Sequence, residues 1–296
     1  MKFKSLVPFI PIVLFFFFLS GTVQAQAPAA RPSPTPQPKP SPSLEKQFFK
    51  NILLDQKAIW TSPFRLHSGD GRWLAPFVIG TGALMATDRM TGDEMAEASN
   101  GVRHASRIIS YGGSTYGVGA VALSFYALGR AKNDERARET GLLGAEALID
   151  TGIVVTALKE IAQRARPMSG RDRSEFFDGG SSFPSGHSIQ AWSLATIVAN
   201  EYHDHPMVQI AAYGIASAVS LSRFTGRNHY LSDVLVGSGL GYGIGRYVYR
   251  THHRKVVDSG GDEEEESFSP SKRWPLIAPQ YDRHAHSYGA TLAWRF

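Results

Sequence analysis

The stretch from residue 44 to 254 most constrains the fold, because its apolar residues recur at helical spacing. No segment in it alternates convincingly between apolar and polar residues, as a half-buried strand would. The predicted fold class is therefore all-α. The spacing predicts helices at residues 44–60, 73–88, 93–110, 115–130, 134–165, 187–204, 206–222 and 229–250.

Several of these helices are apolar for most of their length and rich in Gly, Ala and Ser. Their apolar runs have about 14–16 residues, fewer than the roughly 20 that a membrane span needs. The helix at 134–165 also carries Glu146 and Asp150 in its apolar half. The pattern favours a compact helical bundle, while a polytopic membrane protein stays open as the alternative.

The N-terminal part of the chain predicts export. Residues 1–25 combine a basic start, a short apolar run and small residues at the end, which is typical of a signal peptide. Residues 26–43 are Pro-rich and predict an extended linker. We therefore expect the protein in the periplasm, with a peripheral contact to the membrane as an option.

The C-terminal part differs from the helical domain, which we place at 44–254. Residues 255–271 include an acidic run and predict a solvated loop. Residues 272–296 form a β-like tail, in which 275–281 and 287–296 predict a short hairpin.

Composition excludes some classes of site. The chain has no cysteine, so it has neither disulfides nor thiolate metal sites. Its formal net charge of +5 suits an anionic substrate or a membrane surface, and it is too small to indicate nucleic acid.

A first candidate site lies between Ser222 and Asp233. If His229 opens a helix, Asp233 lies four residues on, on the same face, and can accept a hydrogen bond from one imidazole nitrogen. The other nitrogen is then a nucleophile or a base. Arg223, in the preceding Gly-containing loop, can hold an oxyanion. A surface histidine with a helix ion pair is the alternative.

A second candidate lies between Lys159 and Pro167. Lys159 and Arg166 are seven residues apart, two helical turns, and we expect them on one face of a helix that Pro167 ends at Arg166. Two cations on one face repel unless an anion lies nearby. The alternative is a solvated basic helix end.

The third candidate is the sequence Pro184-Ser185-Gly186-His187 before an amphipathic helix. Loop N–H groups at a helix start form a natural phosphate cradle, and Gly186 permits close approach. His187 can donate a proton to a leaving group. A plain N-cap by Ser185 is the alternative, and it is compatible with the functional role.

Three glycines, Gly237, Gly241 and Gly245, continue the four-residue row that His229 and Asp233 begin. Glycine inside a helix costs about 1 kcal/mol relative to alanine, so this row indicates close backbone contact with a neighbouring helix. Such contact would hold the histidine and the aspartate rigidly.

Together the three motifs resemble the type 2 phosphatidic acid phosphatase superfamily, which includes bacterial class A acid phosphatases and vanadium haloperoxidases. The family pattern is K-x6-R-P, then P-S-G-H, then S-R-x5-H-x3-D, and every fixed position is present in order and at the right spacing. The resemblance covers roughly residues 70–250 and implies the compact helical bundle of that superfamily.

The resemblance also implies roles for these residues. His229 attacks phosphorus and forms a phosphohistidine, Asp233 holds its tautomer, and His187 protonates the leaving oxygen and then activates water. The phosphoryl oxygens are bound by Lys159, Arg166, Ser185, Gly186 and Arg223. No metal or other cofactor is required, and vanadate is expected to inhibit.

The expected activity is therefore metal-independent hydrolysis of phosphate monoesters. Phosphorylated lipids are the favoured substrates and small phosphomonoesters the other class. Two alternatives stay open: a vanadium-dependent haloperoxidase, in which the same residues hold vanadate, and a non-catalytic envelope protein that only binds.

Overall fold

The computed structural model describes residues 44–169, 174–253, 276–282 and 287–293. The predicted signal peptide, the Pro-rich linker and the acidic loop lie outside these residues. The helices are α1 (Leu44–Thr61), α2 (Gly71–Glu94), α3 (Asn100–Gly112), α4 (Thr115–Lys132), α5 (Glu135–Ala162), α6 (Gly186–Glu201), α7 (Pro206–Thr225) and α8 (Leu231–His252). Short 3-10 helices occupy Ser62–Arg65 (η2), Ser68–Asp70 (η3) and Met95–Glu97 (η4).

The all-α prediction is confirmed, and three boundaries need correction. Helix α5 ends at Ala162, not at Arg166, because Gln163 adopts a left-handed conformation (φ 45°) and terminates it. Helix α8 begins at Leu231, so His229 precedes the helix and does not open it. The helix predicted from residue 93 begins only at Asn100, where the Ser99 side chain accepts a hydrogen bond from the N–H of Val102.

The predicted hairpin is also confirmed. Strands β1 (Leu276–Asp282) and β2 (Ser287–Ala293) pair antiparallel, from Leu276 opposite Ala293 to Asp282 opposite Ser287.

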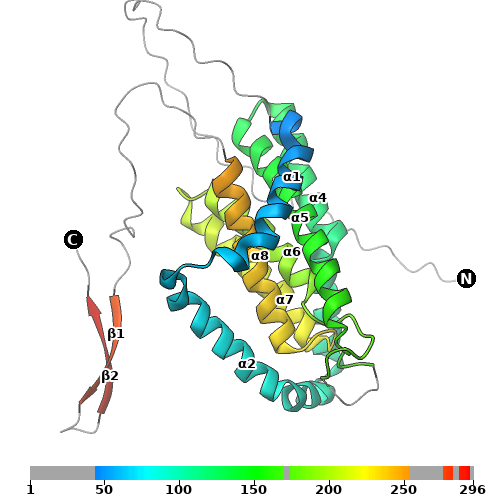
Figure 1. Ribbon diagram of the computed structural model, residues 1–296, viewed down its shortest axis with the longest axis vertical. Coiled ribbons are helices and arrows are strands. Elements are labelled where there is room, and N and C mark those ends of the chain that lie inside the picture. Colours follow the sequence, from blue (N-terminus) through cyan, green and yellow to red (C-terminus); the bar gives the residue numbers. More distant parts are fainter. Residues whose placement is uncertain (1–43, 170–173, 254–275, 283–286, 294–296) are drawn as a thin grey trace, which may run out of the picture. The chain divides into compact units, whose positions relative to one another are not determined.

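Helix α6 lies at the centre of the bundle and contacts α4, α5, α7 and α8, which surround it in Figure 1. One side of α6 packs with α4, α5 and α7, where Leu194 and Val219 are buried. Its other side packs with α5 and α8, where Ile189 and Val248 are fully buried. The hydrophobic core is therefore arranged around α6.

The glycine row of α8 faces α6 at backbone distance, as the sequence predicts. A Cβ built on Gly237 would lie 2.6 Å from the carbonyl oxygen of Ser185, and one on Gly241 would lie 2.2 Å from that of Ile189. Gly245 meets the backbone of Ser193 in the same way. The start of α6 and the start of α8 are therefore held together closely.

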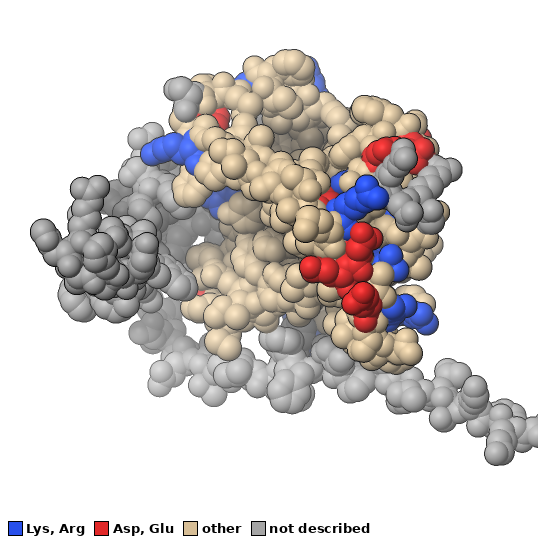
Figure 2. All heavy atoms as spheres, turned by 90° about the horizontal axis from the view of Figure 1, so that it is seen from below, with Lys and Arg blue, Asp and Glu red and all other residues tan. Residues whose placement is uncertain are grey.

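The surface carries many exposed apolar side chains. Figure 2 shows charged side chains gathered at one side of the face in view, beside a wide uncharged area. Among the described residues, α5 alone has the length and composition of a membrane-crossing helix, and half of its apolar window is buried in the bundle. Large exposed apolar residues include Phe49, Leu53, Phe64, Trp73, Ile79, Leu123, Met207, Ile210 and Ile215.

The glycine row provides a matched test of packing. We expect Gly241→Ala to lower the free energy of unfolding by about 1–3 kcal/mol, because the added methyl group overlaps the Ile189 carbonyl. Gly243 lies on the same helix with nothing within 4 Å of its Cβ position, so Gly243→Ala should be neutral or stabilising by up to about 1 kcal/mol. Denaturant unfolding of both variants measures the difference. Equal effects would contradict the close α6–α8 contact.

Candidate active site

His229 and Asp233 meet at the N-terminus of α8. Asp233 is the third residue of the helix, and its Oδ2 accepts a hydrogen bond from the N–H of Tyr230 at 2.9 Å. This capping arrangement turns the carboxylate back toward His229, whose Nδ1 lies 3.6 Å from Oδ2. The two side chains therefore meet through helix capping and not, as predicted, as neighbours on a helix face.

The Nδ1 atom of His229 has a closer partner, the carbonyl oxygen of Ser182 at 2.7 Å. A carbonyl can only accept a hydrogen bond, so Nδ1 carries the proton and Nε2 carries the lone pair. Burial lowers the pKa of His229 to about 4, and Asp233 only partly opposes this. His229 is therefore a buried, neutral imidazole with a defined tautomer at neutral pH.

Asp233 is held by a residue that sequence reasoning missed, Arg164. Its guanidinium lies between two buried carboxylates, with Nη1 2.6 Å from Asp233 Oδ1 and Nη2 2.8 Å from Asp88 Oδ2. Arg164 also donates to Ser232 Oγ at 2.7 Å. The signal was present, because Arg164 lies between Lys159 and Arg166 in the second motif, but the family pattern does not fix it.

The Ser182 hydroxyl completes the environment of Asp233, donating to Oδ2 at 2.5 Å. Burial raises the pKa of the Asp233 carboxyl, but His229, Arg164 and Ser182 together outweigh burial and hold it below its usual value. Asp233 is therefore an ionised group beside the neutral imidazole. Ser182 lies two residues before Pro184 of the third motif and was not predicted as a site residue.

Lys159 and Arg166 meet at Ser181 although they do not share a helix. The Lys159 ammonium donates to the carbonyl oxygen of Ser181, and Arg166 Nη2 lies 3.3 Å from the Ser181 hydroxyl. The prediction that both lie on one helical face is wrong, because the chain leaves α5 at Gln163. Burial and the charges of Arg166 and Arg223 lower the pKa of Lys159 to about 8.

Arg223 lies in the last turn of α7 and not, as predicted, in the loop that follows it. Its side chain is buried and incompletely paired. Its Nη1 donates to the Ser110 hydroxyl at 2.7 Å, which ties it to α3. Its Nε is buried and has no hydrogen-bond partner among the described residues. Burial and the charge of Arg166 lower its pKa to about 10. A buried guanidinium with an unused donor beside other cations suits an anion.

Ser185 caps α6 and joins it to α8. Its hydroxyl accepts from the N–H of Ser188, and its own N–H donates to the carbonyl oxygen of Asp233 at 3.0 Å. The predicted N-cap role of Ser185 is therefore observed. Gly186 lies next to Lys159, because a Cβ built on Gly186 would be 3.9 Å from Lys159 Cε.

His187 lies among the same cations. Burial lowers its pKa to about 3, and the charges of Arg223, His229, Lys159 and Arg166 act in the same direction. The three motifs therefore meet in one site, where two neutral imidazoles lie beside three cationic side chains. Such a site has the charges to bind a phosphoryl group and a nitrogen lone pair to attack it.

Part of the chain is similar to known proteins. Residues 140–256 match the PAP2 superfamily. Over 69 residues the chain is 38% identical to the lipid A 1-phosphatase of Porphyromonas gingivalis, a match that covers 23% of this chain and 16% of that relative. The matched part is thus a small fraction of the relative's length.

Two solved structures are similar in outline. The transmembrane PAP2-type phosphatidylglycerolphosphate phosphatase of Bacillus subtilis is 20% identical, with a TM-score of 0.48, over 71% of this chain and 98% of that one. LpxE of Aquifex aeolicus is 17% identical, with a TM-score of 0.43, over 56% of this chain and 93% of that one.

The buried ion pairs of Arg164 give a test of stability. We expect Arg164→Met to lower the free energy of unfolding by about 3–5 kcal/mol, because it leaves Asp88 and Asp233 buried without a counter-charge. Arg138→Met is the matched control, since the partly exposed pair of Arg138 with Glu45 should contribute at most about 1 kcal/mol. Urea unfolding measures both. Similar losses in the two variants would show that Arg164 does not organise the site.

Proposed function

We propose that this protein, whose residues 140–256 match the PAP2 superfamily, is a metal-independent phosphatase that works through a phosphohistidine on His229. The observation that carries the proposal is the state of His229, a buried neutral imidazole with Nδ1–H held by Ser182 and the lone pair on Nε2. Asp233 lies beside it to stabilise the positive ring that forms when Nε2 becomes bonded.

In the first step, the Nε2 lone pair of His229 attacks phosphorus and the bond from phosphorus to the leaving oxygen breaks. His187 gives its proton to that oxygen, so an alcohol leaves. In the second step, His187 takes a proton from water, the water oxygen attacks phosphorus, and the bond from phosphorus to Nε2 breaks. Phosphate is released and His229 is neutral again.

Three cations replace the metal ion of other phosphoryl-transfer sites in this proposal. Lys159, Arg166 and Arg223 lie close enough to lower the pKa of His187, and Arg223 has an unused buried donor. The first N–H groups of α6, at Gly186 and His187, add donors at the positive end of the helix. These groups would hold the three phosphoryl oxygens and stabilise the charge of the transition state.

The low pKa of His187 indicates how its proton arrives. In the empty site the cations keep His187 neutral, with a pKa of about 3. A bound phosphoryl group brings negative charge that offsets these cations and raises the pKa of His187. The proton therefore enters with the substrate, so the acid exists only when there is a leaving group to protonate.

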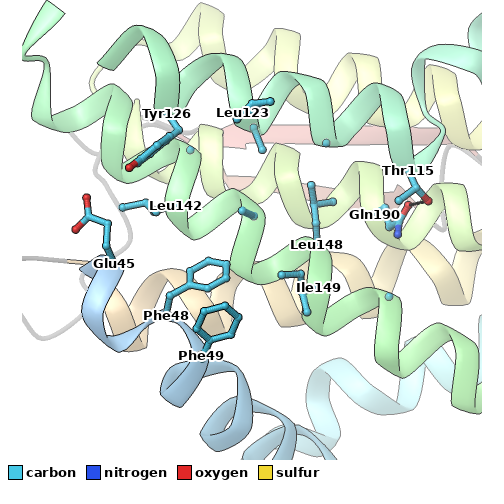
Figure 3. A pocket seen from close by; sticks show the side chains of 15 residues that line it. Glu45, Phe48, Phe49, Thr115, Leu123, Tyr126, Leu142, Leu148, Ile149 and Gln190 are labelled. Carbon is cyan, nitrogen blue, oxygen red and sulfur yellow. Dashed lines mark hydrogen bonds between the residues drawn. The ribbon is translucent and has the colours of Figure 1, made fainter. Parts of the chain in front are cut away.

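A lipid phosphate is the substrate that we favour. An apolar pocket of about 550 Å³ lies between α1, α4, α5 and α6, lined by Phe48, Phe49, Leu123 and others, as Figure 3 shows. Gln190 lies at one end of the pocket, where its Oε1 accepts a hydrogen bond from the Thr115 hydroxyl at 2.8 Å. Gln190 comes one helical turn after His187 on α6, so the pocket begins near the site.

The exposed apolar side chains support work at a membrane surface. Trp73 and Ile79 on α2, and Met207 and Ile210 on α7, are each more than three-fifths exposed. Contact with lipid would remove these apolar side chains from water, which is favourable. We therefore place the protein at the periplasmic membrane surface, where its domain meets lipid substrates and small phosphomonoesters are the secondary class.

The nucleophile is tested with His229→Gln, which keeps an N–H donor for Ser182 but lacks the imidazole. We expect phosphate release to fall by at least ~10³-fold, toward background. His203→Gln, an exposed histidine after α6, is the control and should match wild type. The assay measures phosphate release from an aryl phosphate and from phosphatidate in mixed micelles, in EDTA, with circular dichroism to verify folding.

The rate ratio of the two substrates gives the preferred class. Full activity of a folded His229→Gln would overturn the nucleophile. Inactivity of wild type on both substrates, followed by halide oxidation when vanadate and peroxide are added, would replace the phosphatase by the haloperoxidase alternative.

The alkaline pH profile tests Lys159. The pKa of Lys159 is about 8, so its ammonium group is charged below pH 8. Above pH 8 the group loses its proton and can no longer bind phosphate as a cation. Because kcat/KM reports the free enzyme, wild type should fall about tenfold per pH unit relative to Lys159→Arg above pH 8, after both are normalised at pH 7. Arginine keeps its charge throughout this range. Parallel profiles up to pH 10 would mean that Lys159 does not bind the substrate as a cation.

A further inference from the structure

A second group of ionisable residues lies where α1, α5 and α8 meet. The Nε2 atom of His252, in the last turn of α8, is 2.9 and 3.0 Å from the two carboxylate oxygens of Asp55 on α1. It is also 3.1 Å from Oε1 of Glu146 on α5. One ligand atom from each residue lies within 4.8 Å of the others.

These groups are deeply buried. Asp55 is fully buried, and Glu146 is 2% exposed. Asp150, one turn after Glu146 on α5, is also fully buried. Three buried carboxyl groups therefore lie at this junction, and His252 is within 3.1 Å of two of them. Carboxylates buried in this way need cations as partners.

Two carboxylate oxygens in this group lack a hydrogen bond. Oε1 of Glu146 and Oδ2 of Asp150 are buried without a hydrogen-bond partner among the described residues. Oε1 of Glu146 points at His252, whose single Nε2–H can serve only one of the three oxygens around it. Buried acceptors without a donor are costly, so the remaining oxygens need another positive partner.

Amide groups hold the opposite oxygens of two of these carboxylates. Asn51 Nδ2 lies 3.5 Å from Oε2 of Glu146, and Gln56 Nε2 donates to Oδ1 of Asp150 at 2.8 Å. Each amide orients its carboxylate and leaves the other oxygen unused. Outer groups around metal ligands commonly act in this way.

From this geometry we propose that Asp55, Glu146 and His252 bind one divalent transition-metal ion, Zn²⁺ or Mn²⁺. Ligands bonded to one ion at about 2.0–2.2 Å are about 2.8–3.6 Å apart in octahedral or tetrahedral geometry, and the spacing of 2.9–3.1 Å observed around Nε2 lies in this range. A mixed set of one imidazole and carboxylates suits these two ions better than Mg²⁺ or Cu⁺.

A neighbouring group is satisfied without an ion. His253 Nδ1 lies 3.1 Å from Glu201 and 3.3 Å from Glu139. No carboxylate oxygen of this group is among the buried atoms that lack a hydrogen-bond partner in the described part of the chain. Its side chain is also more exposed than that of His252. The metal is therefore placed at His252.

The ion would join α1 to α5 and α8 at the end of α8 opposite His229. Nineteen residues separate Asp233 from His252, about 30 Å along a helix. The ion is therefore structural and takes no part in the proposed phosphoryl transfer. It also gives a physical reason for the burial of three acidic groups together at this junction.

The test measures metal binding by the full-length protein after removal of metal with EDTA and dialysis. Titration with ZnCl₂ and MnCl₂ separately should show one saturable site per chain and a rise in Tm.

The variant Glu146→Gln, close in shape to the protonated glutamate, should weaken the affinity by at least ~10-fold. Glu160→Gln, an exposed position on the same helix, is the matched control and should bind as wild type. If Glu146→Gln does not fold, His252→Gln removes another of the proposed ligands and serves the same purpose.

Two outcomes would overturn the proposal. One is the absence of a saturable site for either ion. The other is equal affinity in Glu146→Gln and wild type, which would assign binding to exposed histidines. Neither outcome depends on phosphatase activity, so the proposed function is tested separately.

Discussion

The guanidinium of Arg164, ion-paired with Asp88 on α2 and Asp233 on α8, is the contact on which the arrangement of the candidate site depends. The Arg164 side chain is buried, and its guanidinium carbon Cζ lies 4.5 Å from the centre of the Tyr230 ring. Both carboxylates are inaccessible to water, so removal of Arg164 would leave two unpaired buried charges and lower the free energy of unfolding. The pairing fixes Asp233, and Asp233 in turn fixes the N-terminus of α8 and the environment of His229.

A second constraint, the backbone contact between α6 and α8, brings two motifs together. Gly237 and Gly241 have no side chains, so α8 can approach the carbonyl groups of Ser185 and Ile189 closely. The N–H of Ser185 also donates a hydrogen bond to the carbonyl oxygen of Asp233. The start of each helix is thereby held against the other. Rigid placement of this kind suits catalysis, because nucleophile and acid must stay within a small error of their working positions.

The electrostatics of the two ends of α8 differ in a consistent way. At the start of α8, three cationic side chains surround two neutral histidines, and an anion would balance their positive charge. At its end, carboxyl groups gather around His252, and the charge that is missing is that of a cation. Each cluster is costly to bury alone, which is the physical reason for assigning a ligand to each.

The sequence by itself determined the helical fold class, most helix positions and the motifs that supply the candidate site residues, because helical periodicity and motif spacing are local properties. It also indicated the close contact of Gly241, since glycines repeated at four-residue spacing leave one helix face without side chains. Only the tertiary structure showed that Arg164 holds Asp233, that the Ser182 carbonyl sets the tautomer of His229, and that Asp55, far from Glu146 in the chain, lies beside it. Those pairings depend on how separate helices pack, and no spacing along the chain encodes that.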